Sequence, residues 1–256
     1  MRTHDQAVHD QFDPRAAAYL HSAVHAQGPD LLHAQGLVTA LGGSFGSLLD
    51  VGCGAGHLSF ALASAFKRVV AVDPSAGMLT TVTRAAAARG LSQLQVQQGS
   101  AESLPFADST FDVVASRFSA HHWRFMESGV REMCRVLRPG GRLLMIDTVG
   151  HEDALVDTHL QAIELLRDPS HVRNRAVSEW RRLLEEAGLL DIQQAQWSLR
   201  LEFSSWAKRM HTPPSRVAVI RELQQGAARE VQDALALETD GSFNIQVGSF
   251  WARKAS

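Results

Sequence analysis

The sequence contains few cysteines, no long apolar run and no excess of charge. Its 256 residues include two cysteines, Cys53 and Cys134, which are too few for a disulfide framework and are typical of a reducing compartment. The 25 basic and 27 acidic residues predict no general affinity for nucleic acid or anionic membrane. The start, MRTHDQAVHDQF, lacks the pattern of a signal peptide, and no stretch is apolar for as many as about 18 residues. We therefore expect a cytoplasmic protein without a membrane anchor.

The sequence also lacks repeats, low-complexity segments and any linker rich in Gly, Ser and Pro. Its composition, 45% hydrophobic and 20% charged, is typical of a globular chain. We therefore predict a single domain over residues 1–256. It divides into an N-terminal helical cap at 1–45, a core at 46–150 and a third segment at 151–256.

Short apolar runs alternate with helical patterns, which predicts an α/β fold. Because crossovers between parallel strands are right-handed, the sheet is expected to be doubly wound, with helices on both faces. Asp30 is expected to cap a helix that ends at Gly42. Strands are expected at 47–51, 68–72, 94–98, 111–116, 142–148, 192–203 and 243–251. Later helices are expected at 155–163, 178–187, 204–210 and 215–236.

The most distinctive segment is LLDVGCGAG, Leu48 to Gly56, where a predicted strand meets a glycine loop before a helix from His57. Glycines allow a tight turn and a close approach of ligand to backbone, and the helix start offers free N–H groups. The third glycine comes one residue earlier than in the dinucleotide motif G-x-G-x-x-G. This spacing disfavours a pyrophosphate and favours a smaller ligand lying across the loop.

Asp73 follows the glycine loop by about 20 residues, at the end of a predicted strand, where an acidic residue can bind ribose hydroxyls. The alternative is a helix cap before Pro74 and Ser75. With the glycine loop upstream, ribose binding is favoured. The segment GSAESLPF at 99–106 is either an ordinary turn or a site for an adenine edge.

Five segments together resemble a known family: LLDVGCGAG, VVAVDPS, GSAESLPF, FDVVASRFSAHHW and REMCRVLRPGGRLLMID, in order from residue 48 to 147. They resemble the class I S-adenosylmethionine-dependent methyltransferases, in particular the UbiE-like branch that methylates ubiquinone and menaquinone precursors, and its uncharacterised relatives. The resemblance implies a Rossmann-like, mostly parallel seven-stranded sheet with an N-terminal helical lid and C-terminal helical insertions.

The resemblance implies S-adenosylmethionine as the cofactor and S-adenosylhomocysteine as its product. Arg117 stands where the quinone methyltransferases carry serine, so it meets either the cofactor carboxylate or the acceptor. The implied cofactor-binding residues are Tyr19, Asp50, Gly52, Cys53, Gly54, Ala55, Gly56, Asp73, Pro74, Met78, Ser100, Ala101, Glu102 and Arg117.

Methyl transfer requires a catalytic base only where the acceptor is protonated. His121 and His122 follow the fourth predicted strand, at the edge where α/β sheets bind ligands. Either one of them acts as the base, or one packs on Trp123 and the other is solvated. No HExxH motif and no cysteine pair occurs, so no metal site is expected.

Several further residues are candidates for the acceptor side. Tyr19, with Ser22 and His25, either closes over the methyl group or lies at a helix–sheet seam. His171 and Arg173 either line the acceptor pocket or belong to a solvated loop. Trp206 and its neighbour Met210 either form a mobile cover or, as is more common for such stripes, belong to a core.

The sequence therefore predicts a methyltransferase that acts on a small, hydrophobic or aromatic acceptor at carbon, oxygen or nitrogen. An RNA or protein methyltransferase is the second interpretation, which the near-neutral charge and the lack of an RNA-binding module disfavour. A cofactor-binding protein without transferase activity is the third.

Overall fold

A computed structural model of the chain describes residues 3–13, 20, 28–42 and 45–256. Its seven strands form one sheet in the order β3-β2-β1-β4-β5-β7-β6. Strands β1 to β5 pair in parallel, whereas β7 is antiparallel to both of its neighbours. The predicted doubly wound, mostly parallel sheet is confirmed. The strands are β1 (Phe45–Val51), β2 (Phe66–Asp73), β3 (Leu94–Gln98), β4 (Phe111–Arg117), β5 (Leu137–Val149), β6 (Leu189–Leu201) and β7 (Phe243–Lys254).

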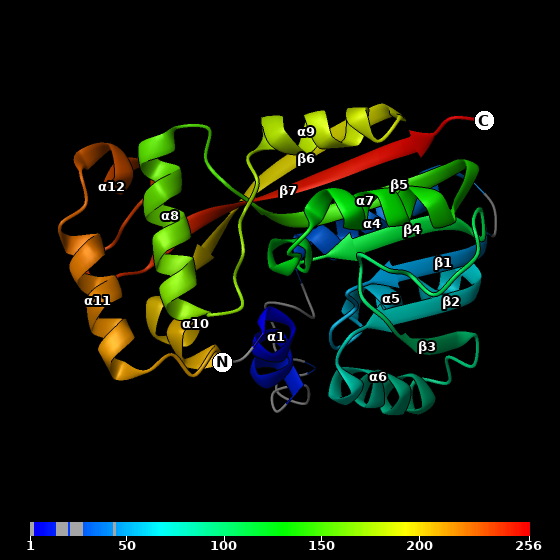
Figure 1. The fold of residues 1–256 in the computed structure, drawn as a ribbon, viewed down its shortest axis with the longest axis horizontal. Helices are drawn as coiled ribbons and strands as arrows, with labels where there is room; N and C mark the ends of the chain where they lie inside the picture. The colour runs from blue at the N-terminus through cyan, green and yellow to red at the C-terminus, as the bar shows by residue number, and fades with distance from the viewer. Residues whose placement is uncertain (1–2, 14–19, 21–27, 43–44) are drawn as a thin grey trace.

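Helices cover both faces of this sheet (Figure 1). The side chains of a strand alternate between its faces, so Leu48 of β1 packs with Leu58 on one side, and Leu49 packs with Val130 and Trp180 on the other. The first face is covered by α4 (Pro29–Ala40), α5 (His57–Leu62) and α6 (Ala76–Ala88), and the second by α7 (Met126–Val136) and α9 (Val177–Glu186).

A third apolar cluster lies beyond one end of the sheet, on the left of Figure 1. Trp206 is buried there, with its ring 6.0 Å from that of Phe203 and 5.0 Å from that of Phe243. The core interpretation of Trp206 is therefore confirmed. The cluster is formed by α8 (Ala154–Arg167), α10 (Phe203–Arg209), α11 (Pro214–Gln225) and α12 (Arg229–Leu235), together with parts of β6 and β7.

Three local predictions are wrong. The helix expected at 215–236 is two helices, because the chain leaves helical geometry at Gly226 and restarts at Arg229. Asp30 is not a helix cap, since α4 begins after Gly28 and Asp30 is buried in its first turn. The strand expected at 142–148 begins at Leu137, and its register with β4 shifts between the pairs Phe111–Leu137 and Val113–Arg142.

The parallel strands β1, β2 and β4 all end at the same edge of the sheet. Helix α1 (His4–Phe12) lies over this edge in Figure 1. None of the helices in the described part of the chain is both long and apolar enough to cross a membrane.

Candidate active site

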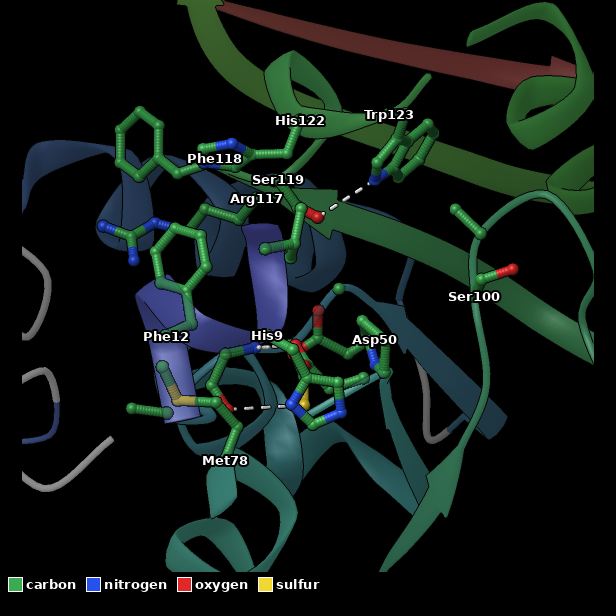
Figure 2. A pocket seen from close by; sticks show the side chains of 18 of the residues that line it. His9, Phe12, Asp50, Met78, Ser100, Arg117, Phe118, Ser119, His122 and Trp123 are labelled. Atoms are coloured by element: carbon green, nitrogen blue, oxygen red, sulfur yellow. Dashed lines mark hydrogen bonds between the residues drawn. The ribbon is translucent and has the colours of Figure 1, made fainter. Parts of the chain in front are cut away.

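A cavity of about 260 Å³ lies at the carboxyl ends of β1, β2 and β4, the edge at which open α/β sheets bind their ligands. Four loops and α1 form its walls (Figure 2). The lining residues are His4, Asp5, Val8, His9 and Phe12 of α1; Asp50, 52–55, His57 and Leu58; Asp73, Pro74 and Met78; Ser100, Ala101 and Glu102; and Arg117, Phe118, Ser119, His122 and Trp123.

The glycine loop is held against the end of β2. The N–H groups of Gly52 and Cys53 both donate to the Val72 carbonyl, at 2.8 and 2.9 Å. Gly52 has φ 68°, and a Cβ there would lie 1.9 Å from Ser119 Oγ. A Cβ on Gly54 would meet nothing within 4 Å, so the backbone at Gly54 is open to a ligand in the cavity.

Gly56 is not among the lining residues. It is the left-handed cap before α5, with φ 85°, and a Cβ there would lie 2.9 Å from Phe60. Gly56 thus allows the sharp turn between the glycine loop, which lines the cavity, and α5. Cys53 is buried beside Leu79 and Val82, and burial raises the pKa of its thiol, which is therefore protonated at neutral pH.

Asp73 ends β2 and points its carboxylate at the glycine loop. Its Oδ2 accepts the Gly54 N–H at 2.9 Å, and its Oδ1 accepts the Ser75 N–H at 2.9 Å. Burial raises its pKa to about 6, against the effect of these two hydrogen bonds. The alternative interpretation of Asp73 as a helix cap is wrong, because Ser75 caps α6 by accepting the Met78 N–H.

Two buried side chains of opposite charge line the cavity, and each has an atom without a partner. Asp50 Oδ2 accepts both the N–H and the hydroxyl of Ser59 at 3.0 and 2.6 Å, while its Oδ1 has no hydrogen-bond partner. Burial raises the pKa of Asp50 to about 6. Arg117 Nε donates to the Asp30 carboxylate, while Nη2 is buried without a partner.

Buried polar atoms are normally hydrogen-bonded. The carboxylate oxygen of Asp50 and the guanidinium nitrogen of Arg117, both on cavity-lining residues, therefore fit a ligand that carries both an ammonium and a carboxylate. An amino acid moiety has this pair of groups.

His122 lies on the wall opposite Asp50 and Ser100, near Phe12 and Phe118 (Figure 2). Its ring contacts the Phe12 ring edge-on, with centroids 5.0 Å apart. Burial, and then His121, lower the pKa of His122 to about 4.

His121 lies behind His122 and does not line the cavity. The centroids of the two rings are 4.1 Å apart, so the interpretation in which one packs on Trp123 and the other is solvated is wrong. His121 Nδ1 lies 2.6 Å from Asp147 Oδ1. Burial lowers the pKa of His121, but Asp147 outweighs it, and the pKa is raised overall.

Comparison with known proteins identifies the family. Residues 49–145 match a family model described as a methyltransferase domain. The uncharacterized protein YafE of Escherichia coli is 46% identical over 201 residues, covering 78% of this chain and 97% of YafE. The uncharacterized methyltransferase YcgJ of Bacillus subtilis is 35% identical over 228 residues, 88% of each chain. Its crystal structure superposes with a TM-score of 0.82 at 33% identity, covering 88% of this chain and 99% of YcgJ.

The chain is a class I S-adenosylmethionine-dependent methyltransferase. Its core is also 37% identical over 100 residues to the ubiquinone/menaquinone biosynthesis C-methyltransferase UbiE of Rubrivivax gelatinosus, covering 39% of this chain and 38% of UbiE. The resemblance predicted from the five segments is thus confirmed, and S-adenosylmethionine is the cofactor.

Most of the residues predicted to bind the cofactor of this methyltransferase are gathered around this cavity. Of those that the structure describes, all except Gly56 line it. Tyr19 and His25 lie outside the described residues.

Neither His171 nor Arg173, two acceptor-side candidates, lines the cavity. His171 Nε2 contacts Gln161 Oε1 at 2.8 Å, and Arg173 pairs with Glu179 at 3.1 Å. His171 nonetheless lies close behind the cavity wall, since its ring is 5.9 Å from that of His121.

The N-terminal helical lid was expected, but the residues of α1 that line the cavity were not identified from the sequence. Val8 and Phe12 lie one turn apart and both line the cavity. His4 Nε2 lies 2.9 Å from the His122 carbonyl oxygen, which fixes α1 over this wall. An apolar pair four residues apart was the available signal, but it does not reveal which surface a helix covers. Among the described residues, no group of three or more His, Cys, Asp or Glu side chains is arranged to hold a metal ion.

Proposed function

We propose that this methyltransferase acts on a small hydrophobic or aromatic acceptor, which binds beside the cofactor in the cavity at the carboxyl ends of β1, β2 and β4. The observation that carries this proposal is the contrast between two walls. Asp50, Asp73 and the glycine loop contribute polar groups to the lining, whereas the rings of Phe12, Phe118 and Trp123 lie apart from Asp50 (Figure 2). Aromatic walls bind flat apolar compounds, and few polar groups then fix their orientation.

The polar wall would hold the cofactor. The open backbone at Gly54 receives its methionine part, and Asp73 accepts hydrogen bonds from the ribose hydroxyls. Around the adenine would lie Pro74, Met78, Ser100, Ala101 and Glu102, which line the cavity beyond β2 and β3. When bound, the cofactor supplies an activated methyl group on a sulfonium, so the protein mainly orients the two reactants and excludes water.

Asp50 and Arg117 would bind the two charged groups of the cofactor's amino acid moiety. Asp50 Oδ1 faces the ammonium, and Arg117 Nη2 faces the carboxylate, which gives each buried atom the partner it lacks within the protein. Asp30 holds the guanidinium in place through Nε. This assigns Arg117 to the cofactor rather than to the acceptor.

Calorimetry with two ligands tests the cofactor assignment. S-adenosylhomocysteine carries the amino acid moiety, and 5′-methylthioadenosine lacks it. A hydrogen bond to a charged group is worth about 1.5–3 kcal/mol. Arg117→Met should therefore weaken the binding of S-adenosylhomocysteine by about 10- to 150-fold and leave the affinity for 5′-methylthioadenosine unchanged. An equal loss of affinity for both ligands, or no loss for either, would contradict the assignment.

Two further variants serve as controls in this experiment. Arg117→Met alone leaves the Asp30 carboxylate buried and unpaired, which destabilises a fold, so the double variant with Asp30→Asn repeats the measurement. Arg181→Met removes a guanidinium from the outer surface of α9, where Arg181 is 54% exposed, and should change neither affinity.

A labelled-methyl transfer assay tests the acceptor class. An extract of the source organism is separated into small-molecule, RNA and protein fractions, and each fraction receives the enzyme and labelled S-adenosylmethionine. The label is expected in an organic-soluble product of the small-molecule fraction. Label confined to RNA or protein would replace the proposal with the second interpretation, and tight cofactor binding without transfer to any fraction would support the third.

A further inference from the structure

His122 lines the cavity, and one nitrogen of its ring carries no proton. Its Nδ1 has two neighbours, the Ser170 carbonyl oxygen at 3.0 Å and Ser170 Oγ at 3.3 Å. The carbonyl can only accept a hydrogen bond. The hydroxyl donates its own proton to Asp168 Oδ1 at 2.6 Å, so it also acts as an acceptor towards His122. Nδ1 must therefore carry the proton, and the neutral ring leaves Nε2 unprotonated.

The segment that sets this tautomer is itself fixed. Asp168 and Ser170 are buried, and the Asp168 carboxylate accepts the Ser170 N–H at 2.8 Å as well as its hydroxyl. The orientation of the Ser170 carbonyl thus depends on Asp168. No described residue forms a hydrogen bond with His122 Nε2, and His122 lines the cavity.

The two neighbouring histidines are arranged for other roles. His171 Nε2 donates to Gln161 Oε1 at 2.8 Å, because the Gln161 amide nitrogen is already directed at Asp157 and the Asn174 carbonyl. His121 is paired with Asp147, which raises its pKa. His121 therefore keeps its proton more firmly than an ordinary histidine does.

We propose that His122 is the catalytic base, that it accepts the acceptor's proton at Nε2, and that Asp168 and Ser170 are positioning residues that fix this tautomer. The acceptor then belongs to the aromatic hydroxyl compounds. This inference rests on the proposed function. A base is needed only where the methylated atom carries a proton, and the rings of Phe12, Phe118 and Trp123 in the cavity lining favour an aromatic acceptor.

The step balances without a further reactant. The hydroxyl proton moves to His122 Nε2 while the oxygen electron pair forms the new bond to the methyl carbon. The electron pair of the broken carbon–sulfur bond stays on sulfur and yields the thioether product. The His122 imidazolium then releases its proton to water.

Nitrogen NMR of the histidine-labelled protein saturated with S-adenosylhomocysteine tests the tautomer without turnover. At neutral pH His122 should show a protonated Nδ1 and an unprotonated Nε2. Ser170→Ala retains the backbone carbonyl that accepts the Nδ1–H, so it should leave Nδ1 protonated. A proton on Nε2, or an imidazolium, in the unaltered protein would overturn the proposal.

The transfer assay on the small-molecule fraction tests catalysis. His122→Asn retains an amide N–H in place of Nδ1 and removes Nε2, so the rate should fall by about 100-fold or more, with unchanged affinity for S-adenosylhomocysteine. Ser170→Ala removes the hydroxyl's contact with His122 Nδ1 and its hydrogen bond to Asp168, and should lower the rate by about 2- to 10-fold, again with unchanged affinity. An unchanged rate in His122→Asn would overturn the proposal, and equal losses of rate and affinity would reduce His122 to a structural role.

The product identifies the acceptor class and separates the two proposals. Mass spectrometry should find a methyl ether of an aromatic hydroxyl. A small-molecule product methylated on a sulfur or on an aprotic nitrogen would overturn this inference and leave the proposed function intact. No small-molecule product at all would overturn the proposed function, and this inference would fall with it.

Discussion

Replacing Asp50 with Asn should stabilise the cofactor-free protein. The side chain is 1% exposed, and its carboxylate has hydrogen bonds at Oδ2 only. Asn has nearly the shape of a protonated carboxyl group, and its oxygen can accept the same two bonds from Ser59. The substitution therefore removes a buried charge while the packing is retained.

The pKa of Asp50 gives the magnitude and the sign. Burial raises it from 3.8 to about 6, which corresponds to about 3 kcal/mol of preference for the neutral form in the folded protein. The folded state thus binds more protons than the unfolded state between these two pKa values, and stability falls as the pH rises through this window. Above it, Asp50→Asn should be more stable than the unaltered protein by up to about 3 kcal/mol. About half of that advantage should be gone at pH 5.

Urea unfolding at pH 5, 6.5 and 8, without cofactor, measures this difference. Asp112→Asn is the matched control, because the Ser47 and Arg138 contacts outweigh burial and lower the pKa of Asp112. Its carboxylate remains charged throughout this range, so Asp112→Asn should destabilise the protein by the same amount at all three pH values.

The result that would refute this reasoning is an Asp50→Asn protein that is less stable than the original at pH 8, or an advantage that does not shrink towards pH 5. The substitution should also weaken the binding of S-adenosylhomocysteine, because the ammonium of this ligand loses a charged partner. Greater stability with weaker binding would show that Asp50 is retained for the ligand at the expense of the fold.

Three other substitutions separate binding from folding. Asp73→Ala should weaken the binding of S-adenosylhomocysteine by at least about tenfold in calorimetry, since hydrogen bonds to a charged acceptor are worth about 1.5–3 kcal/mol. An unchanged affinity would contradict the assignment of Asp73 to the ribose. Gly52→Ala should abolish cofactor binding, because its Cβ would lie 1.9 Å from Ser119 Oγ at a positive φ; an unchanged affinity would show that the loop can shift to accommodate the methyl group. Trp206→Ala should lower the free energy of unfolding by about 3–5 kcal/mol in urea and leave the cofactor affinity of the folded protein unchanged; a loss of affinity would show that this core also supports the cofactor site.

The parts of the site that could be predicted from the sequence depend on short-range order. Gly52, Gly54 and Asp73 lie within about two dozen residues, and a strand, a turn and a helix position them almost without help from the rest of the chain. The turn needs glycine at Gly52 and Gly56 for reasons of backbone geometry, and such requirements leave a pattern in the sequence.

The parts that could not be predicted depend on contacts between distant segments. Arg117 donates a hydrogen bond to Asp30, which lies 87 positions away in the sequence. This partner cannot be seen in the local sequence around Asp30, which resembles that of a helix cap. His122 receives its tautomer from Ser170, 48 positions away. Each of these residues is unremarkable in its local segment, because only the tertiary fold gives a side chain a distant partner. The break between α11 and α12 was missed for a different reason: a helical pattern can continue across a short interruption in the helix.

The difference between residues that are positioned locally and residues that depend on distant contacts explains why the family resemblance determines the cofactor and not the acceptor. The proposed cofactor wall comes from residues 50–117, which lie entirely within the 49–145 segment that matches the family. The proposed acceptor wall also needs Phe12 from α1, and its histidine is oriented by Ser170, and both lie outside that segment. Backbone geometry constrains the first wall, so its sequence is recognisable. Side chains on separate elements make the second wall, so a change of acceptor requires no change in the glycine loop, and the acceptor must be inferred from the chemistry of those side chains.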